Sequence, residues 1–157
     1  MNQPYDGQIR AGDAAVEAAL VSARADAADT PPLVYLAAPY SHPNLRVRAA
    51  RYRACNRAAG RLWLERRQLP FSPITHSHPV CVFARSAGTW AEWSALDRVV
   101  LPACRRLYVL TLPGYLASVG VQAELELAHD AGVPVEELDP AYWSAPIDVP
   151  TMHWGAL

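Results

Sequence analysis

A chain of 157 residues with 52% hydrophobic and 18% charged residues can form one globular domain with its own core, and this composition excludes a disordered protein. The formal net charge of -1 argues against duplex nucleic acid or an anionic membrane as the partner. All 14 basic residues are arginine, so a lysine Schiff base, a Walker-type phosphate lysine and a Ser-Lys dyad are excluded.

The three cysteines, Cys55, Cys81 and Cys104, are odd in number and lack the spacing of metal ligands. They are typical of reduced, mostly buried side chains in a cytoplasmic protein. No apolar run reaches the roughly 18 to 20 residues that a membrane span needs, and the first residues lack the features of a signal peptide. We therefore expect a cytoplasmic protein without a membrane partner.

Residues 1–30 differ from the rest of the sequence. The alanine-rich run at 13–21 predicts one helix, which ends before Pro31. This segment is either an arm used in oligomerisation or a peripheral extension, and the sequence leaves both open. We expect the folded domain to span residues 31–157.

Short apolar runs and amphipathic stretches alternate from residue 33 onwards. Strands are expected at residues 33–38, 68–72, 106–112 and 133–135. Helices are expected at residues 45–67, 90–103 and 118–131, the last followed by Gly132 at the C′ position. Residues 73–79 are expected to form a loop, and the tail 139–157, rich in Pro and Trp, shows no periodicity.

This alternation predicts an α/β fold: a flavodoxin-like, doubly wound, mostly parallel sheet with helices on both faces. Ligands of such sheets bind beyond the carboxyl ends of the strands, near the point where the strand order reverses. The segments to search for chemistry are therefore residues 39–48, 73–79 and 113–124.

Residues 35–40 read YLAAPY, and residues 118–124 read SVGVQAE. The first motif resembles the opening strand and loop of the nucleoside 2-deoxyribosyltransferase-like superfamily, and the second resembles the start of its nucleophile-bearing helix. Asp97 falls where the family places a second carboxylate. The resemblance covers residues 33–135, and it is closest to a bacterial branch marked by a His-Ser-His-Pro loop, here 76–79, followed by Trp-x-x-Trp, here 90–93.

The resemblance implies cleavage of the sugar–base bond of a nucleoside or a nucleoside 5′-monophosphate. Glu124 would be the nucleophile, giving a covalent glycosyl-enzyme, and Asp97 the general acid or base. The helix start would favour ionised Glu124, and burial would raise the pKa of Asp97. Water as the acceptor gives hydrolysis, and a second base gives transfer.

Both carboxylates also have ordinary interpretations. A glutamate in a first helical turn is usually a surface residue, and Asp97 could pair with Arg98 or Arg105 at the surface. Glu126 competes with Glu124, but two positions along a helix amount to about 200° around it, so both cannot face one site. We expect Glu124 to face the loops.

The start of the long helix, residues 41–48, combines serine, histidine and two arginines. A helix start beside an arginine is an anion site, which in nucleotide-specific members of the superfamily helps to hold the 5′-phosphate. Further along this helix, Arg51 and Arg53 are expected on a solvated face.

The His-x-His pair at 76–78 could chelate zinc, but no third ligand stands out, so a substrate contact or a role in fixing the loop is preferred. Trp90 and Trp93 share one helical face and either pack in the core or stack on a base. Tyr35 either lines the sugar pocket or is plain core. The candidate substrate contacts are Tyr35, Pro39, Tyr40, Ser41, His42, Arg46, His76, His78, Trp93, Ser118 and Gly120.

The sequence departs from the transferases of the family at Ser118, where those enzymes carry Asp, and its nucleotide hydrolases often carry Ser there. This favours phosphate-bearing substrates and hydrolysis.

The resemblance implies a homodimer or higher oligomer, because the transferases complete each site with residues of a neighbouring subunit. It implies no metal or organic cofactor. A nucleotide-binding sensor without turnover is the alternative.

Overall fold

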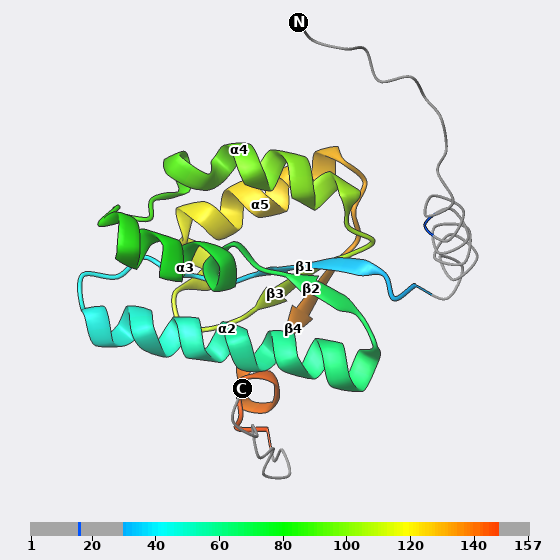
Figure 1. Ribbon diagram of the computed structural model, residues 1–157, viewed down its shortest axis with the longest axis horizontal. Coiled ribbons are helices and arrows are strands. Elements are labelled where there is room, and N and C mark those ends of the chain that lie inside the picture. Colours follow the sequence, from blue (N-terminus) through cyan, green and yellow to red (C-terminus); the bar gives the residue numbers. More distant parts are fainter. Residues whose placement is uncertain (1–15, 17–29, 148–157) are drawn as a thin grey trace, which may run out of the picture. The chain divides into compact units, whose positions relative to one another are not determined.

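The computed structural model describes residue 16 and residues 30–147 of the chain (Figure 1). The chain divides between Pro31 and Pro32, and every strand and helix named below belongs to the second unit, Pro32–Leu157. The predicted N-terminal helix, apart from Val16, and residues 148–157 of the tail lie outside the described residues. No described helix combines the length and the apolar character needed to cross a membrane.

Within the described residues, four parallel strands form one sheet in the order β2-β1-β3-β4. The strands are β1 (Leu33–Ala37), β2 (Leu69–Phe71), β3 (Leu107–Leu110) and β4 (Val135–Leu138). This order is that of a flavodoxin-like sheet, in which the chain moves outward from β1 to β2 and then crosses back to β3. The predicted α/β fold is confirmed, and the switch point lies between β1 and β3.

Helices cover both faces of this sheet. In Figure 1, α4 and α5 lie above it and α2 lies below it. The helices are α2 (Leu45–Arg66), α3 (Pro73–Ala84), α4 (Trp90–Val100), α5 (Val119–Asp130) and the short α6 (Pro140–Trp143). Two 3-10 turns follow α4 and β3: η2 (Leu101–Ala103) and η3 (Tyr115–Ala117).

Strand alternation divides the core into two layers. In β1, Val34 and Leu36 belong to the apolar cluster on the α2 side, whereas Tyr35 and Ala37 belong to the cluster on the α5 side. All four side chains are fully buried, so β1 lies at the centre of the core. The buried residues of α2 are Ala54, Cys55, Ala58 and Leu62.

The expectation of a loop at residues 73–79 is wrong, because α3 runs through this segment. Ser72 occupies the N-cap position and Pro73 the first turn, where the missing N–H of proline costs nothing. The buried positions of α3 recur at helical spacing, which places one face of the helix against the core. They are Ile74, Ser77 and Cys81.

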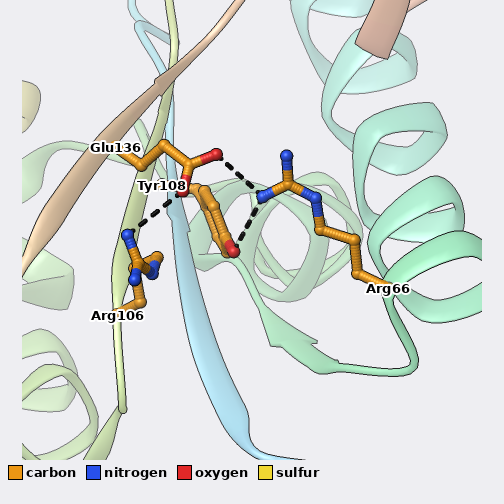
Figure 2. A network of polar contacts seen from close by, with 4 residues as sticks. All are labelled: Arg66, Arg106, Tyr108 and Glu136. Carbon is orange, nitrogen blue, oxygen red and sulfur yellow. Dashed lines mark hydrogen bonds and ion pairs between the residues drawn. The ribbon is translucent and has the colours of Figure 1, made fainter.

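The last strand also differs from the expectation of residues 133–135, since β4 begins at Val135 and contains two glutamates. Figure 2 shows how one of them is accommodated at the sheet edge: Glu136 accepts from Arg66 at 2.8 Å and from Arg106 at 3.1 Å. Arg66 also donates to the Tyr108 hydroxyl at 2.9 Å. Glu136 pairs with the core residue Tyr108 in the ladder, and its charge is accommodated at the sheet edge by these two arginines, so apolar patterning alone misses the strand.

The other element bounds agree with the sequence to within a few residues. The helix expected at 90–103 finishes as η2, and α5 ends beside Gly132, which adopts the predicted left-handed conformation with φ 67°. In the tail expected to be irregular, Asp139 caps the single turn of α6 by accepting from the Ala141 N–H at 2.8 Å.

Candidate active site

Two buried carboxyl groups meet on the α5 side of the sheet. Glu124, in the second turn of α5, is 5% exposed, and Asp97, in the last turn of α4, is 1% exposed. The Tyr35 hydroxyl of β1 lies between them, 2.8 Å from Asp97 Oδ1 and 3.0 Å from Glu124 Oε1. Glu126 is exposed, so Glu124 is the glutamate of this pair that faces inward.

These three groups share protons. The single hydroxyl proton of Tyr35 can be donated to one carboxylate at a time, so the second short contact requires a proton on a carboxyl group. Both contacts are satisfied when the Asp97–Glu124 pair holds one proton between its two carboxyl groups.

The surroundings of the pair explain why it keeps this proton. Burial raises the pKa of Glu124 well above its usual range, and the nearby Asp97 adds to this, while the hydrogen bond from Tyr35 opposes it. Burial also raises the pKa of Asp97, again against the effect of Tyr35. The pKa of Tyr35 itself is raised by burial and by both carboxyl groups, so its hydroxyl stays protonated.

The surroundings of the carboxyl groups differ from two expectations. Glu124 lies beyond the first turn of α5, where the helix dipole acts, and burial raises its pKa, although the dipole was expected to favour the ionised form. Asp97 does not pair with Arg98 or Arg105 at the surface, because it is buried and accepts from Tyr35 instead.

A cavity of about 510 Å³ opens above these carboxyl groups, beyond the carboxyl ends of β1 and β3. Asp97 and Glu124 contribute to its lining, and Tyr35 lies behind them in the core. Several of the predicted substrate contacts also line it: Pro39, Tyr40, Ser41, Trp93, Ser118 and Gly120. Ser118 additionally caps α5, since its Oγ accepts from the Val121 N–H at 3.5 Å.

Two predicted contacts at the start of α2 do not line the cavity. His42 and Arg46 are exposed, and both take part in the local turn around Asn44. The His42 ring accepts from the Asn44 N–H at 3.0 Å, and the Asn44 side chain caps the helix by accepting from the Arg46 N–H at 2.8 Å.

The two histidines of the His-Ser-His-Pro segment are also outside the cavity lining, and Ser77 between them contributes to it instead. Because this segment is helical, neighbouring side chains point in different directions. His76 is exposed and meets Trp93 edge-on, with ring centroids 5.7 Å apart. His78 contacts Tyr40 at the rear of the cavity wall.

Arg51 is a cavity residue that the sequence interpretation missed, since it was expected on a solvated face. Its guanidinium donates to the Ser41 carbonyl at 2.9 Å and to the Pro113 carbonyl at 2.8 Å, and so joins the loops after β1 and β3. The signal was present: Arg51 lies four residues after Val47 and three before Ala54, inside the apolar stripe of the helix.

Trp90 and Trp93 line the cavity and are only partly buried, so of the two alternatives core packing does not hold. With Tyr40 they give the cavity three aromatic residues. Such side chains offer flat apolar surface to a ring-shaped ligand.

Within the described residues, no three His, Cys, Asp or Glu side chains are placed to hold a metal ion. Cys55, Cys81 and Cys104 are free and buried, as predicted.

Residues 32–139 match a protein-family model described as Domain of unknown function (DUF1937). No curated protein matches the chain. The match covers more than half of the sequence and includes every residue that lines the cavity. The chain therefore belongs to the DUF1937 family.

Proposed function

We propose that this domain cleaves the N-glycosidic bond of a nucleoside or a nucleoside 5′-monophosphate, with Glu124 as the nucleophile and Asp97 as the general acid and base. The observation that carries the proposal is the buried carboxyl pair, bridged by the Tyr35 hydroxyl and facing a cavity at the switch point of the sheet. The resemblance of residues 35–40 and 118–124 to the nucleoside 2-deoxyribosyltransferase-like superfamily supports this choice of substrate.

The reaction uses the one proton of the pair. Ionised Glu124 attacks the anomeric carbon, the carbon–nitrogen bond breaks, and the electron pair remains on the base, which takes the proton of Asp97. Water or a second base then attacks the anomeric carbon. Asp97 takes a proton from that acceptor, and the Glu124 carboxylate is released.

The positive charge that develops at the sugar favours the ionised form of Glu124 over the protonated one. As the glycosidic bond breaks, the shared proton is therefore expected to stay on Asp97 until the base takes it. Tyr35 contacts both carboxyl groups, and its hydroxyl provides the path by which the proton passes between them.

Substrates that carry a 5′-phosphate find two suitable features in the cavity lining. The Arg51 guanidinium supplies a positive charge, and the start of α5 at Ser118 and Gly120 supplies a helix N-terminus. Together they support a nucleoside monophosphate as the substrate, and water as the acceptor gives hydrolysis.

The proposal is tested by incubating the full chain with common ribo- and deoxyribonucleosides and their 5′-monophosphates, and measuring free base by chromatography. We expect base release from at least one compound, and a loss of about 100-fold or more in Glu124→Gln and in Asp97→Asn. Glu126→Gln is the matched control, because Glu126 is exposed on the same helix, and it should retain the parent rate.

Release by Glu124→Gln at the parent rate would contradict the proposal. So would a parent chain that binds these compounds without releasing base, since that outcome would assign the domain to nucleotide binding without turnover.

A further inference from the structure

The His78 ring bridges two tyrosines from different parts of the chain. Its Nδ1 lies 2.6 Å from the Tyr40 hydroxyl, in the loop after β1. Its face is stacked on the Tyr52 ring of α2, with centroids 4.1 Å apart and planes 21° from parallel. Tyr40 meets the same ring edge-on, at 5.7 Å between centroids. His78 is thus held by packing on one side and bonded to Tyr40 on the other.

Tyr40 also lies close to the loop that contains Gly88. A Cβ added to Gly88, in the loop between α3 and α4, would lie 3.7 Å from Tyr40 Cε1 and 3.2 Å from Cys81 Sγ. Gly88 also has φ 68°, a conformation that favours glycine. A larger residue at this position would strain the loop where it approaches Tyr40 and Cys81. Tyr40 and Gly88 are both part of the cavity lining.

The charge state of His78 fits a fixed, neutral ring. Burial lowers its pKa, and the neighbouring Arg48 lowers it further. At neutral pH the imidazole therefore carries no charge that would draw it out of the stack with Tyr52. His78 makes its hydrogen bond from behind the cavity wall and does not itself line the cavity.

We propose that His78 is a positioning residue for ligand binding: it fixes the Tyr40 ring as a rigid wall of the cavity, against which the planar base of the ligand packs. The inference rests on the proposed function for the identity of the ligand. Whatever the ligand is, His78 affects its binding only through the Tyr40 hydroxyl.

A double-mutant cycle tests this coupling. Dissociation constants and base release are measured for the nucleosides and 5′-monophosphates with Tyr40→Phe, His78→Phe and the double variant. Each single change should weaken binding by about fivefold, the scale of one hydrogen bond, and the double variant should bind no more weakly than Tyr40→Phe alone. His78→Asn, whose amide can replace Nδ1, should restore much of the loss. His129→Phe, an exposed histidine on α5, is the control.

Two outcomes would overturn the inference: losses that multiply in the double variant, or a His78→Phe chain that binds as the parent does. If His78→Phe does not fold, His78→Leu, which also lacks a hydrogen-bonding group, replaces it in the cycle with Tyr40→Phe. Binding without base release would contradict the proposed reaction and leave the cycle measurable. A parent chain that binds none of the compounds would contradict both.

Discussion

At the scale of single residues, the central feature is a tyrosine hydroxyl placed between two buried carboxyl groups. Ionising a carboxyl group in this position costs free energy, because burial removes the water that would solvate the charge. The burial that makes Glu124 and Asp97 costly to ionise raises the pKa of both groups above their ordinary values, which is the direction that acid–base work near neutral pH requires.

This cost predicts a gain in stability when Glu124 is made neutral. The folded-state pKa of Glu124 lies above the ordinary value of 4.5. The contribution of this group to the free energy of unfolding is therefore fully present below pH 4.5, and it is lost as the pH rises through the folded-state pKa. Glu124→Gln cannot ionise and should exceed the parent in free energy of unfolding by about 1 kcal/mol or more at pH 8, with a smaller difference at pH 5.

Urea denaturation at the two pH values measures this difference. Glu126→Gln, at an exposed position of the same helix, should show the same small effect at both. A Glu124→Gln variant that is less stable than the parent at pH 8 would show that Glu124 is ionised and stabilised in the folded state, and so would contradict the raised pKa.

At the scale of elements, α2 contributes to the site through Arg51, whose guanidinium holds together the loops after β1 and β3. Arg51→Met keeps the apolar stem and removes the charge. We expect binding of a 5′-monophosphate to weaken by about tenfold or more and binding of the matching nucleoside by about twofold, because the phosphate alone needs the charge.

Calorimetric titration of both ligands gives these two ratios, with the exposed Arg53→Met on the same helix as the control. Equal losses for the two ligands would limit Arg51 to holding the loops and would remove the support for a phosphate-bearing substrate.

The sequence predicted the elements well where patterning was simple and failed where a local rule was overridden. The buried run of β1 and the helix closed by Gly132 follow from apolar spacing and glycine chemistry. The helix α3 does not, because Pro73 and Pro79 imitate a loop although Pro73 suits a first turn. Because residues 73–79 were expected to form a loop, His76 and His78 were predicted to contact the substrate, whereas the helix places Ser77 in the cavity lining instead.

At the scale of the whole molecule, the topology of the sheet brings together the residues of the candidate site, which lie far apart in the sequence. Tyr35 is 62 residues from Asp97 and 89 from Glu124 in the chain, and the parallel strands β1 and β3, with the helices that follow or precede them, bring the three together. The alternation of strands and helices was enough to predict that this edge of the sheet holds the cavity.

The inward direction of Glu124 was also predictable, since it shares the buried face of α5 with Val121 and Ala128. The bridge through Tyr35 was not, because its hydroxyl is directed by the pairing of β1 with β3, which spacing in the chain does not reveal.

The central claim, that Glu124 forms a covalent bond with the sugar, is tested most directly by acid quench of the parent chain during turnover, followed by peptide mass mapping. We predict that the peptide containing Glu124 gains the mass of the glycosyl group, and that this adduct is absent from Glu124→Gln. Base release by the parent with the adduct on another residue, or unchanged release by Glu124→Gln, would contradict the claim.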